Sequence, residues 1–384
     1  MSCLNRHTLL FITAMVKTTI LTALAICGLC CRAQETAGIV SMPTAGVWPD
    51  SDGNHINAHG GNVIFHDGAY YWYGEQRPER GFTVDAGVSC YRSDDMLNWE
   101  NVGTVMTVSQ TPGDDIESGC IIERPKVVYN EKTGKFVMWF HLELKGKGYE
   151  AARAGVAVAD TPDGPFTFVG SGRINPGKLP LNLDSGVSDS VFNYDQEWWT
   201  PAWREDISRG MFTLRDKDGG QMSRDMTIFV DDDGKAYHIY SSEDNLTLQI
   251  AELDDSYTSH TGKYIRIFPG GHNEAPAMFK HDGVYWMIAS GCTGWEPNEA
   301  RLMKADDIMG EWEMLPNPCR GKNAEKTFGG QSNYVFREPG ENGRYIAMFD
   351  VWNPKSLANS RYIWLPIEFG DDGVPRIEYR SEFR

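Results

Sequence analysis

The sequence predicts an all-β fold and, more narrowly, a five-bladed β-propeller. Forty glycines and nineteen prolines among 384 residues suit many short strands and turns, and no long amphipathic helical period is present. A strand–turn–strand unit recurs five times along the chain. Five such units arranged radially build a propeller whose innermost strands line a central channel. With 41% hydrophobic and 12% aromatic residues, the chain can bury a core of that size.

The five copies share one pattern: a polar residue, an apolar run, a turn with glycine, and a second apolar or aromatic segment. In chain order they span residues 57–73, 123–139, 223–237, 272–287 and 331–349. Alternation around turns such as Asp67-Gly68 is typical of β-hairpins. Related segments follow three of the hairpins, at 90–99, 157–166 and 303–312. We expect these to be structural outer strands that end in a turn before a packed aromatic residue.

The polar residue of each copy stands where the first strand begins. His59, Asp225 and Glu274 precede the turn glycine of their copy by nine residues, whereas Glu123 and Gln331 precede theirs by eleven and twelve. A slightly longer turn accounts for the difference. Because the innermost strands of a propeller surround one channel, five such side chains would converge on one place. We therefore expect the functional site there.

The first 33 residues read as an export signal. Arg6 and Lys17 supply positive charge, residues 18–30 form an apolar run, and small residues favour cleavage after Ala33. Met15 is an alternative start that would give a more compact signal. The predicted mature chain is therefore 34–384, one propeller domain.

A membrane anchor is disfavoured, because a spanning helix needs about twenty apolar residues and this run is shorter. A lipoprotein is an alternative, since Cys27, Cys30 and Cys31 follow the run. However, none of these cysteines is preceded by the small residues that a lipid-attachment site prefers. We expect a secreted or periplasmic protein with no membrane contact after cleavage.

The mature chain is strongly acidic. Removing residues 1–33, which carry three basic and no acidic side chains, takes the formal net charge from −17 to about −20. Such a surface repels nucleic acid and anionic membranes, whereas a neutral oligosaccharide or polysaccharide is a compatible partner. We expect a monomer.

Four cysteines remain in the mature chain: Cys90, Cys120, Cys292 and Cys319. They allow three pairings, between which the sequence does not choose. Buried thiols or a single disulfide fit better than a catalytic thiol. No spacing of cysteine and histidine indicates a zinc site, and we expect neither a metal nor a cofactor.

A long insertion, at about residues 171–221, separates the second and third copies. Long loops with aromatic residues of their own often form lids or decorated edges. Trp198, Trp199 and Trp203 could stack on the apolar faces of sugar rings or could fill a small core of the insertion itself. Both interpretations stay open at this stage.

Several motifs, in a fixed order, resemble the family 43 glycoside hydrolases, and more narrowly the branch that contains the exo-β-1,3-galactanases. They read Asn57-Ala58-His59-Gly60-Gly61, Tyr71-Trp72-Tyr73-Gly74-Glu75, Glu123-Arg124-Pro125-Lys126-Val127, Ser223-Arg224-Asp225, Glu274-Ala275-Pro276 and Ser290-Gly291-Cys292-Thr293-Gly294-Trp295. The resemblance runs from about Ile56 to Leu365. It implies a five-bladed propeller and glycoside hydrolysis with inversion at the anomeric carbon, here with release of galactose from β-1,3-linked galactan.

The resemblance also implies roles for individual residues. Glu274 matches the general acid, and Asp225 matches the carboxylate that raises its pKa and orients it. The usual general base is an aspartate on the inner strand of the first blade, where this chain has His59-Gly60-Gly61. The galactanase branch shares that departure and has a glutamine proposed as the base through its imidic acid form, at the place of Gln331. Glu123 matches a residue assigned to substrate contact.

The chemistry leaves the identity of the base open. Inverting hydrolysis needs one protonated carboxyl group and a second group, roughly 6.5–9.5 Å away, that activates water. A neighbouring negative charge raises a carboxyl pKa, so Asp225 would keep Glu274 protonated near neutral pH. An amide is a poor base, and on chemistry alone the carboxylate of Glu123 is the better candidate. The resemblance favours Gln331.

Six further side chains are expected to bind substrate: His59, Glu75, Trp295, Asn333, Trp199 and Trp203. For His59, support of the channel floor is the alternative to a substrate contact. Two other functions stay open beside an exo-acting galactanase. One is another family 43 activity, on arabinofuranosyl or galactofuranosyl groups, and the other is a sugar-binding propeller without catalysis. The carboxylates of Glu123, Asp225 and Glu274 argue against the last, because sugar binding alone does not require them to cluster.

Overall fold

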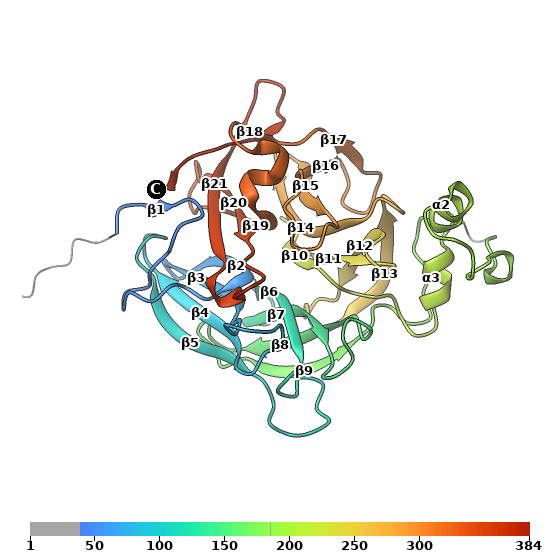
Figure 1. Cartoon of the computed structure of the whole chain (residues 1–384), viewed down its shortest axis with the longest axis horizontal. Coiled ribbons are helices and arrows are strands. Elements are labelled where there is room, and N and C mark those ends of the chain that lie inside the picture. Colours follow the sequence, from blue (N-terminus) through green and yellow to red (C-terminus); the bar gives the residue numbers. More distant parts are fainter. Residues whose placement is uncertain (1–38, 185) are drawn as a thin grey trace, which may run out of the picture. The chain divides into compact units, whose positions relative to one another are not determined.

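Five sheets of the unit Val40–Arg384 surround a common axis, as the view along that axis shows (Figure 1). The structure is a computed structural model and describes residues 39–184 and 186–384. The five-bladed propeller predicted from the repeats is confirmed. The predicted export signal, residues 1–33, lies outside the described residues and stays a prediction.

Each blade is built from strands that are consecutive in the chain and pair in antiparallel order. The first blade contains β2 (His59–His66), β3 (Ala69–Glu75), β4 (Gly87–Ser93) and β5 (Glu100–Thr107). The second contains β6 (Ile121–Asn130), β7 (Lys135–Glu143), β8 (Arg153–Ala159) and β9 (Thr167–Gly172). The third contains β10 (Met226–Val230), β11 (Ala236–Ser242), β12 (Thr247–Leu253) and β13 (His260–Ile267).

The fourth blade contains β14 (Asn273–His281), β15 (Val284–Gly291), β16 (Arg301–Ala305) and β17 (Glu313–Leu315). The fifth contains β19 (Gln331–Arg337), β20 (Tyr345–Val351), β21 (Arg361–Phe369) and β22 (Pro375–Glu378), and the short β18 (Cys319–Arg320) pairs in parallel with β22. Two 3₁₀ turns, η2 (Ala324–Gly329) and η3 (Leu357–Asn359), lie in its connections. The outer strands expected at 90–99, 157–166 and 303–312 contribute to β4, β8 and β16.

The hairpin turns of the first and fourth blades have the conformation that their sequences predict. Asp67 and Gly68 have φ values of 47° and 84°, and Asp282 and Gly283 have 49° and 81°. Two central residues with positive φ match the right-handed twist of the flanking strands. These turns therefore fix the register of each hairpin and, through it, which residue begins each inner strand.

Aromatic packing joins the first blade to the fifth. The Trp364 ring lies 5.0 Å from that of Trp48 and 4.7 Å from that of Trp72, centroid to centroid. All three indoles are fully buried. Near them, β1 (Met42–Pro43) pairs with β23 (Glu382–Phe383), which ties the two ends of this unit together. Because large aromatic rings dominate the energetics of such cores, this cluster closes the ring of blades.

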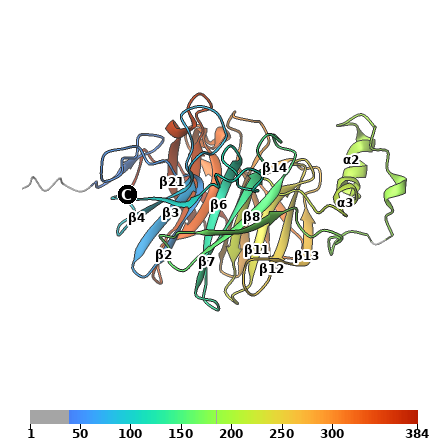
Figure 2. The same ribbon diagram turned by 90° about the horizontal axis from the view of Figure 1, so that it is seen from below.

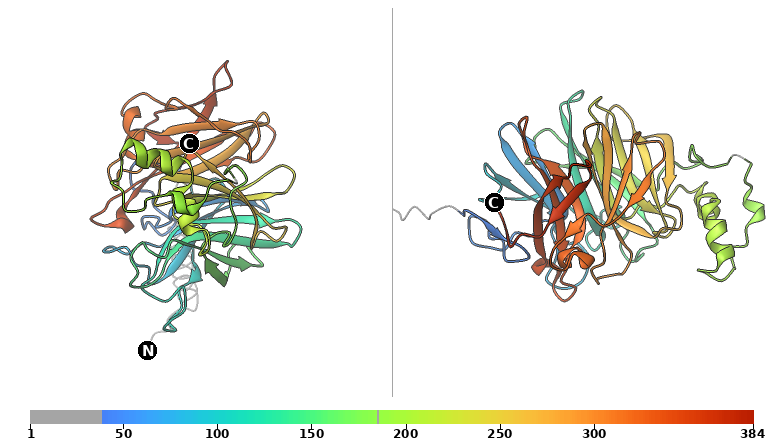
Figure 3. Two further views of the ribbon diagram at one scale, coloured as in Figure 1. Left: turned by 90° about the vertical axis from the view of Figure 1, so that its right-hand side faces the viewer. Right: turned by 90° about the horizontal axis from the view of Figure 1, so that it is seen from above.

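The insertion leaves the propeller after β9 and returns at β10. It contains the 3₁₀ turn η1 (Asp189–Val191) and the helices α2 (Pro201–Ser208) and α3 (Met211–Asp216). Thr200 caps α2 by accepting a hydrogen bond from the Trp203 backbone N–H at 3.2 Å, and Pro201 occupies the first helical position. Both helices lie outside the ring of blades, beside the third blade (Figures 2 and 3).

The aromatic residues of the insertion mainly build its own core. Trp203 is fully buried in a cluster that consists of Phe192, Trp203, Ile207, Met211, Phe212 and Leu246. A side chain without exposed surface does not reach a substrate, so the prediction of a sugar contact for Trp203 is corrected. Among the residues that the structure describes, no helix is long and apolar enough to cross a membrane. Among the described residues, Cys90, Cys120, Cys292 and Cys319 are free thiols.

Candidate active site

A cavity of about 310 Å³ opens where the inner strands of the blades begin. It receives side chains from all five blades and the loops between them: Glu75, Arg77, Phe82, Glu123, Arg124, His141, Tyr149, Arg224, Asp225, Asn245, Glu274, Gly294, Trp295, Gln331 and Trp352. We call it the active cavity. The four residues predicted to be catalytic all line it, so the convergence expected from their register is found for the second to fifth blades.

A β-bulge follows the polar residue in four of the inner strands. The strand register shifts between His59 and Asn62, between Glu123 and Lys126, between Glu274 and Ala277, and between Ser332 and Tyr334. Residues Gly60, Arg124 and Ala275 within these bulges have positive φ. A bulge inserts an extra residue, bends the strand and re-aims its side chains. The bulges bend the inner strands at these positions, where Glu123, Glu274 and Gln331 line the active cavity and His59 does not.

Glu274 lies half-buried beside two partners that orient its carboxyl group. The Asn245 side-chain amide donates a hydrogen bond to Oε1 at 2.9 Å, and the thiol of Cys292 lies against the same carboxyl group. Burial and, after it, the negative charge of Asp225 raise the pKa of Glu274 to about 7. The sequence predicts that the neighbouring charge raises this pKa, but the larger cause in the structure is burial.

Asp225 is joined to the strand that carries Glu274. Its Oδ2 accepts a hydrogen bond from the Ala275 backbone N–H at 3.1 Å and forms an ion pair with Arg124 at 2.9 Å. The Arg124 guanidinium also donates to Gln331 Oε1 at 2.6 Å and to the Ser332 carbonyl at 2.9 Å. This buried arginine thus links the second, third and fifth blades. It stands next to Glu123 in the sequence, yet nothing in that position marks it as a link between blades.

Glu123 is surrounded by hydrogen-bond donors. Its Oε1 accepts from Arg77 and from Tyr149, each at 2.9 Å, and its Oε2 contacts His141 Nδ1 at 3.1 Å. Burial opposes its charge, but the hydrogen bonds and charges of His141 and Arg77 outweigh burial and hold the pKa of Glu123 far below its usual range. Glu123 is therefore ionised and a weak base.

A second carboxylate lies behind His141. Glu143 is fully buried, and its Oε1 contacts His141 Nε2 at 2.9 Å, while its Oε2 accepts from the Ala152 backbone N–H at 2.9 Å. Burial opposes protonation of the imidazole, but the hydrogen bonds to Glu123 and Glu143 outweigh it and raise the pKa of His141 to about 9. The imidazolium between two carboxylates therefore carries a positive charge at neutral pH. Glu143 follows His141 by two residues and Glu123 precedes it by eighteen. This spacing matches no sequence motif, so the contact could not be predicted from the sequence.

The amide of Gln331 is fixed by three hydrogen bonds. Its Oε1 accepts from Arg124 at 2.6 Å and from the Trp352 indole N–H at 2.9 Å, and its Nε2 donates to Ser290 Oγ at 3.0 Å. These partners assign the orientation of the amide, because only oxygen accepts from two such donors. Two donors at the oxygen stabilise negative charge there.

The first blade presents Glu75 to the active cavity in place of His59. His59 is fully buried, stacks on Tyr362 at 4.9 Å between ring centroids, and lies 3.5 Å from Asp350. It does not line the active cavity, so the predicted substrate contact is corrected and His59 supports the channel floor. Glu75, at the end of β3, pairs closely with Arg77 and accepts from the Arg124 backbone N–H at 2.9 Å.

Gly60 leaves the space that Glu75 fills. A Cβ at position 60 would lie 2.2 Å from Glu75 Oε1, and φ at Gly60 is +63°. We expect Gly60→Ala to displace the Glu75 carboxylate and the Arg124 backbone, and to lower kcat/KM by about ten- to a hundredfold. Steady-state kinetics on a β-1,3-linked galactobiose checks this. Gly170→Ala is the control, since its Cβ would meet no atom within 4 Å; equal activity of the two variants would contradict the prediction.

An aromatic wall borders the active cavity on the side of the fifth blade. Trp295 stacks on Phe82 with 5.8 Å between centroids and 9° between planes, and it meets Trp352 edge-on at 5.9 Å. Trp295 and Phe82 are partly exposed. Of these three residues only Trp295 was predicted from the sequence, because it ends the motif Ser290–Trp295, whereas Phe82 and Trp352 lie outside the motifs that carry the family resemblance.

The two remaining predicted contacts lie outside the active cavity. Asn333 is buried and accepts a hydrogen bond from the Lys126 ammonium at 3.2 Å. Its predicted role as a substrate contact is therefore corrected to a structural one. Trp199 is exposed and lies 5.3 Å from the ring of His272, two residues before Glu274, but it does not line the active cavity.

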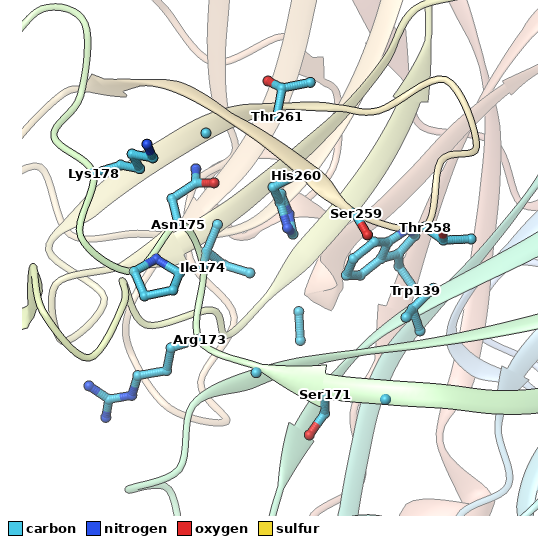
Figure 4. Close-up of a pocket in the computed structure, with 16 residues that line it drawn as sticks. Trp139, Ser171, Arg173, Ile174, Asn175, Lys178, Thr258, Ser259, His260 and Thr261 are labelled. Atoms are coloured by element: carbon cyan, nitrogen blue, oxygen red, sulfur yellow. The ribbon is translucent and has the colours of Figure 1, made fainter.

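A second cavity, of about 350 Å³, lies between the outer strands of the second and third blades (Figure 4). Trp139, Ile174, Asn175 and His260 are among the residues that line it, and none of its lining residues is a carboxylate. Burial lowers the pKa of His260 to about 4, so its imidazole is neutral. This cavity lacks the paired acidic groups of the active cavity and is not a candidate for acid-assisted hydrolysis.

The chain is similar in sequence and in fold to known glycoside hydrolases. A sequence model of glycosyl hydrolases family 43 matches residues 202–375. The solved structure of a β-1,3-galactosidase, BT3683, with galactodeoxynojirimycin is 62% identical, covers 89% of this chain and 99% of that chain, and has a TM-score of 0.86. The exo-β-1,3-galactanase of Clostridium thermocellum is 35% identical, with coverage of 89% and 66% and a TM-score of 0.72.

The exo-β-1,3-galactanase of Phanerochaete chrysosporium, solved with galactose, is 30% identical, with coverage of 89% and 67% and a TM-score of 0.70. A curated β-D-galactofuranosidase of Aspergillus niger is 30% identical over 125 residues, which are 32% of this chain and 36% of that protein. The match with BT3683 extends over nearly all of that chain, and the carboxylates expected from the family line one cavity of the same propeller. The chain belongs to family 43 of the glycoside hydrolases.

Proposed function

We propose that the protein removes terminal galactose from β-1,3-linked galactan, with inversion at the anomeric carbon. One observation carries the proposal: a half-buried carboxyl group with a pKa of about 7, Glu274, lies in one cavity with Asp225 and Gln331. An acid that is protonated near neutral pH, beside a second group that can activate water, is what inverting hydrolysis requires. The β-1,3-galactosidase and exo-β-1,3-galactanases similar to this chain support the choice of sugar and linkage.

Glu274 acts as the general acid in this proposal. Its protonated carboxyl group gives a proton to the glycosidic oxygen while the bond between that oxygen and C1 breaks. A water molecule attacks C1 from the opposite face and loses a proton to the base, so the product is α-galactose. Asn245 donates to Oε1 of Glu274, which leaves Oε2 to carry the acidic proton. Asp225, fixed by Arg124, raises the pKa of the acid through its charge.

We assign the base to Gln331 rather than Glu123. Glu123 holds its negative charge against two cationic partners, His141 and Arg77, so it takes a proton from water only with difficulty. Each carboxylate oxygen has two lone pairs, and three of the four on Glu123 already accept hydrogen bonds. The fourth is free to accept a hydrogen bond from a sugar hydroxyl, which makes Glu123 a substrate contact.

The aromatic wall supports an exo mode of action. Trp295, Phe82 and Trp352 close one side of the active cavity, and a polymer running through the site would have to cross them. A pocket closed on one side suits a single terminal sugar, whose apolar face can lie against Trp295. The rest of the polysaccharide then leaves on the open side.

Hydrolysis of β-1,3-galactan tests the proposal. We expect purified protein to release galactose as the main early product, and NMR to detect the α-anomer first. Arabinofuranosyl and β-D-galactofuranosyl substrates are tested in parallel, because the Aspergillus niger relative is named a β-D-galactofuranosidase. If either furanoside were cleaved faster than β-1,3-galactan, the protein would be assigned that furanosidase activity instead. Binding of galactan without any cleavage would indicate a sugar-binding propeller.

The pH dependence of activity follows from the state of Glu274. The acid must be protonated to act, and its pKa is about 7, so kcat/KM should stay high below that pH and fall about tenfold per pH unit above it. Rates measured between pH 5 and 9 on β-1,3-galactobiose check this. For 2,4-dinitrophenyl β-galactoside, whose leaving group needs no proton, kcat/KM should fall much less as the pH rises above 7. If kcat/KM fell equally with rising pH on both substrates, the loss of activity above pH 7 could not be assigned to deprotonation of Glu274.

We further propose that the protein is exported, that it acts as a monomer, and that its partner is a neutral polysaccharide outside the cytoplasm. The export signal predicted in residues 1–33 and the strongly negative net charge of −17 support this. Mass spectrometry of protein recovered from the culture medium or the periplasm should find a mature chain that begins at residue 34.

A further inference from the structure

The connection between β11 and β12 has an unusual backbone beside the active cavity. Glu243, Asp244 and Asn245 have φ values of 52°, 56° and 65°. This left-handed region is sparsely populated by residues other than glycine. Three such residues in succession persist only where the surroundings hold them. We call residues 243–246 the anchored turn.

Buried polar contacts hold the first residue of the anchored turn. Arg266 donates to both carboxylate oxygens of Glu243, at 2.6 and 2.7 Å, and Thr213 of α3 donates to Oε1 at 2.7 Å. The same guanidinium donates to the carbonyls of Ile207 at 2.7 Å and Ser208 at 3.1 Å, at the end of α2. Glu243 is fully buried. Arg266 thus ties the insertion to the anchored turn.

Two further contacts join the anchored turn to the insertion. The Asp244 carboxylate accepts a hydrogen bond from Arg215 of α3 at 2.8 Å. Leu246 is fully buried in the core of the insertion, with Trp203 and Met211 among its neighbours. The helices lie beside the third blade (Figure 2), whose strands β11 and β12 the anchored turn connects. Three of its four residues are therefore held by the insertion or by Arg266, which the insertion engages.

Asn245 is the remaining residue of the anchored turn, and its side chain faces the active cavity. Its side-chain amide donates to Glu274 Oε1 at 2.9 Å, and its backbone carbonyl accepts from the thiol of Cys292 at 3.8 Å. The hydrogen bond at Oε1 makes that oxygen an acceptor. The acidic proton of Glu274 is consequently placed on Oε2, the atom that must face the glycosidic oxygen.

We propose that the insertion at 171–221 positions the general acid: it clamps the anchored turn and thereby holds Asn245 against Glu274. The inference rests on the proposed role of Glu274 as the acid. It gives the insertion a function other than direct sugar stacking. Asn245 and the residues that clamp its turn are positioning residues, since they act through Glu274.

The test compares two substrates that differ in their need for an acid. Thr213→Val removes the hydroxyl that donates to Glu243, and Arg215→Gln removes the ion pair with Asp244. Both variants should lower kcat on β-1,3-galactobiose by about tenfold, because small displacements of an acid are costly. Turnover of 2,4-dinitrophenyl β-galactoside, which needs no proton at the leaving group, should change less than about twofold. Thr213→Ser, which keeps the hydroxyl, should restore the wild-type ratio.

Arg209→Gln is the matched control. Arg209 follows α2, pairs with Asp206 at 3.3 Å on the surface and has no contact with the anchored turn. It should leave both rates unchanged. Thermal melting identifies any variant that fails to fold. If Thr213→Val fails to fold, the test rests on Arg215→Gln, because the Arg215 side chain lies near the surface and its replacement should not prevent folding.

Two results would overturn the inference. One is an equal loss on both substrates, which indicates a general structural defect, and the other is no loss on galactobiose. A wild-type protein that cleaves neither substrate would instead refute the proposed function. Failure of the positioning role with an active wild type leaves the function intact.

Discussion

Glu274→Gln is expected to lower kcat on β-1,3-galactobiose by about a thousandfold, within the range that general acid catalysis contributes. Glutamine matches the size of the side chain and can still accept the hydrogen bond from Asn245 at its oxygen. It cannot give a proton of the required acidity to the glycosidic oxygen. Because that transfer occurs only in the transition state, kcat and kcat/KM should fall together.

The leaving group provides the internal check for this variant. On 2,4-dinitrophenyl β-galactoside, Glu274→Gln should retain most of the wild-type rate, since dinitrophenolate departs without protonation. Glu299→Gln, an exposed position of the same chemistry, is the control and should behave like wild type on both substrates. If Glu274→Gln kept a tenth of the wild-type activity on galactobiose, Glu274 could not be the general acid.

Gln331→Ala is expected to lower kcat by about a thousandfold as well, whereas Glu123→Gln should lower kcat/KM by only about ten- to a hundredfold, largely through KM. The difference follows from their surroundings. Glu123 is an ionised, weakly basic carboxylate that can still accept a hydrogen bond from a sugar. Gln331 takes the proton of water only in its imidic acid form, at the nitrogen, and the contacts of Arg124 and Trp352 with Oε1 fix the orientation of this side chain.

Azide distinguishes the two candidates directly. A small anion needs no deprotonation, so sodium azide should restore turnover of 2,4-dinitrophenyl β-galactoside by Gln331→Ala and yield α-galactosyl azide. Glu123→Gln should show no such rescue, because its defect is in binding. Rescue of the Glu123 variant alone would transfer the role of base to Glu123, as the chemistry of the isolated side chains suggests.

The sequence was most informative where the structure is local and repeated. Turns such as Asp67-Gly68 and Asp282-Gly283 fix their hairpins through two residues with positive φ. The spacing from each turn then locates Glu274 and Asp225 at the start of their strands. The same argument failed for His59, because the bulge at Gly60 and the adjacent Glu75 put a different side chain in the channel.

Contacts between blades could not be derived in this way. Arg124 joins Asp225 and Gln331, which are separated from it by 101 and 207 positions, and only packing of the blades brings them within 3 Å. The state of Glu123 likewise depends on His141 and Arg77, whose side chains meet it across strands. No periodicity links these positions, so the choice between two candidate bases was left open by the sequence.

The sequence by itself determined the propeller, its five repeats and the carboxylates that line its channel, since hairpin turns and strand alternation are encoded by neighbours along the chain. Only the tertiary structure decided how those carboxylates behave. Burial raises the pKa of Glu274, and cationic partners lower the pKa of Glu123. Residues of the insertion contact the anchored turn, whose Asn245 donates a hydrogen bond to Glu274. Desolvation and charge act through space, and the distances between side chains exist only once the blades have closed into a ring.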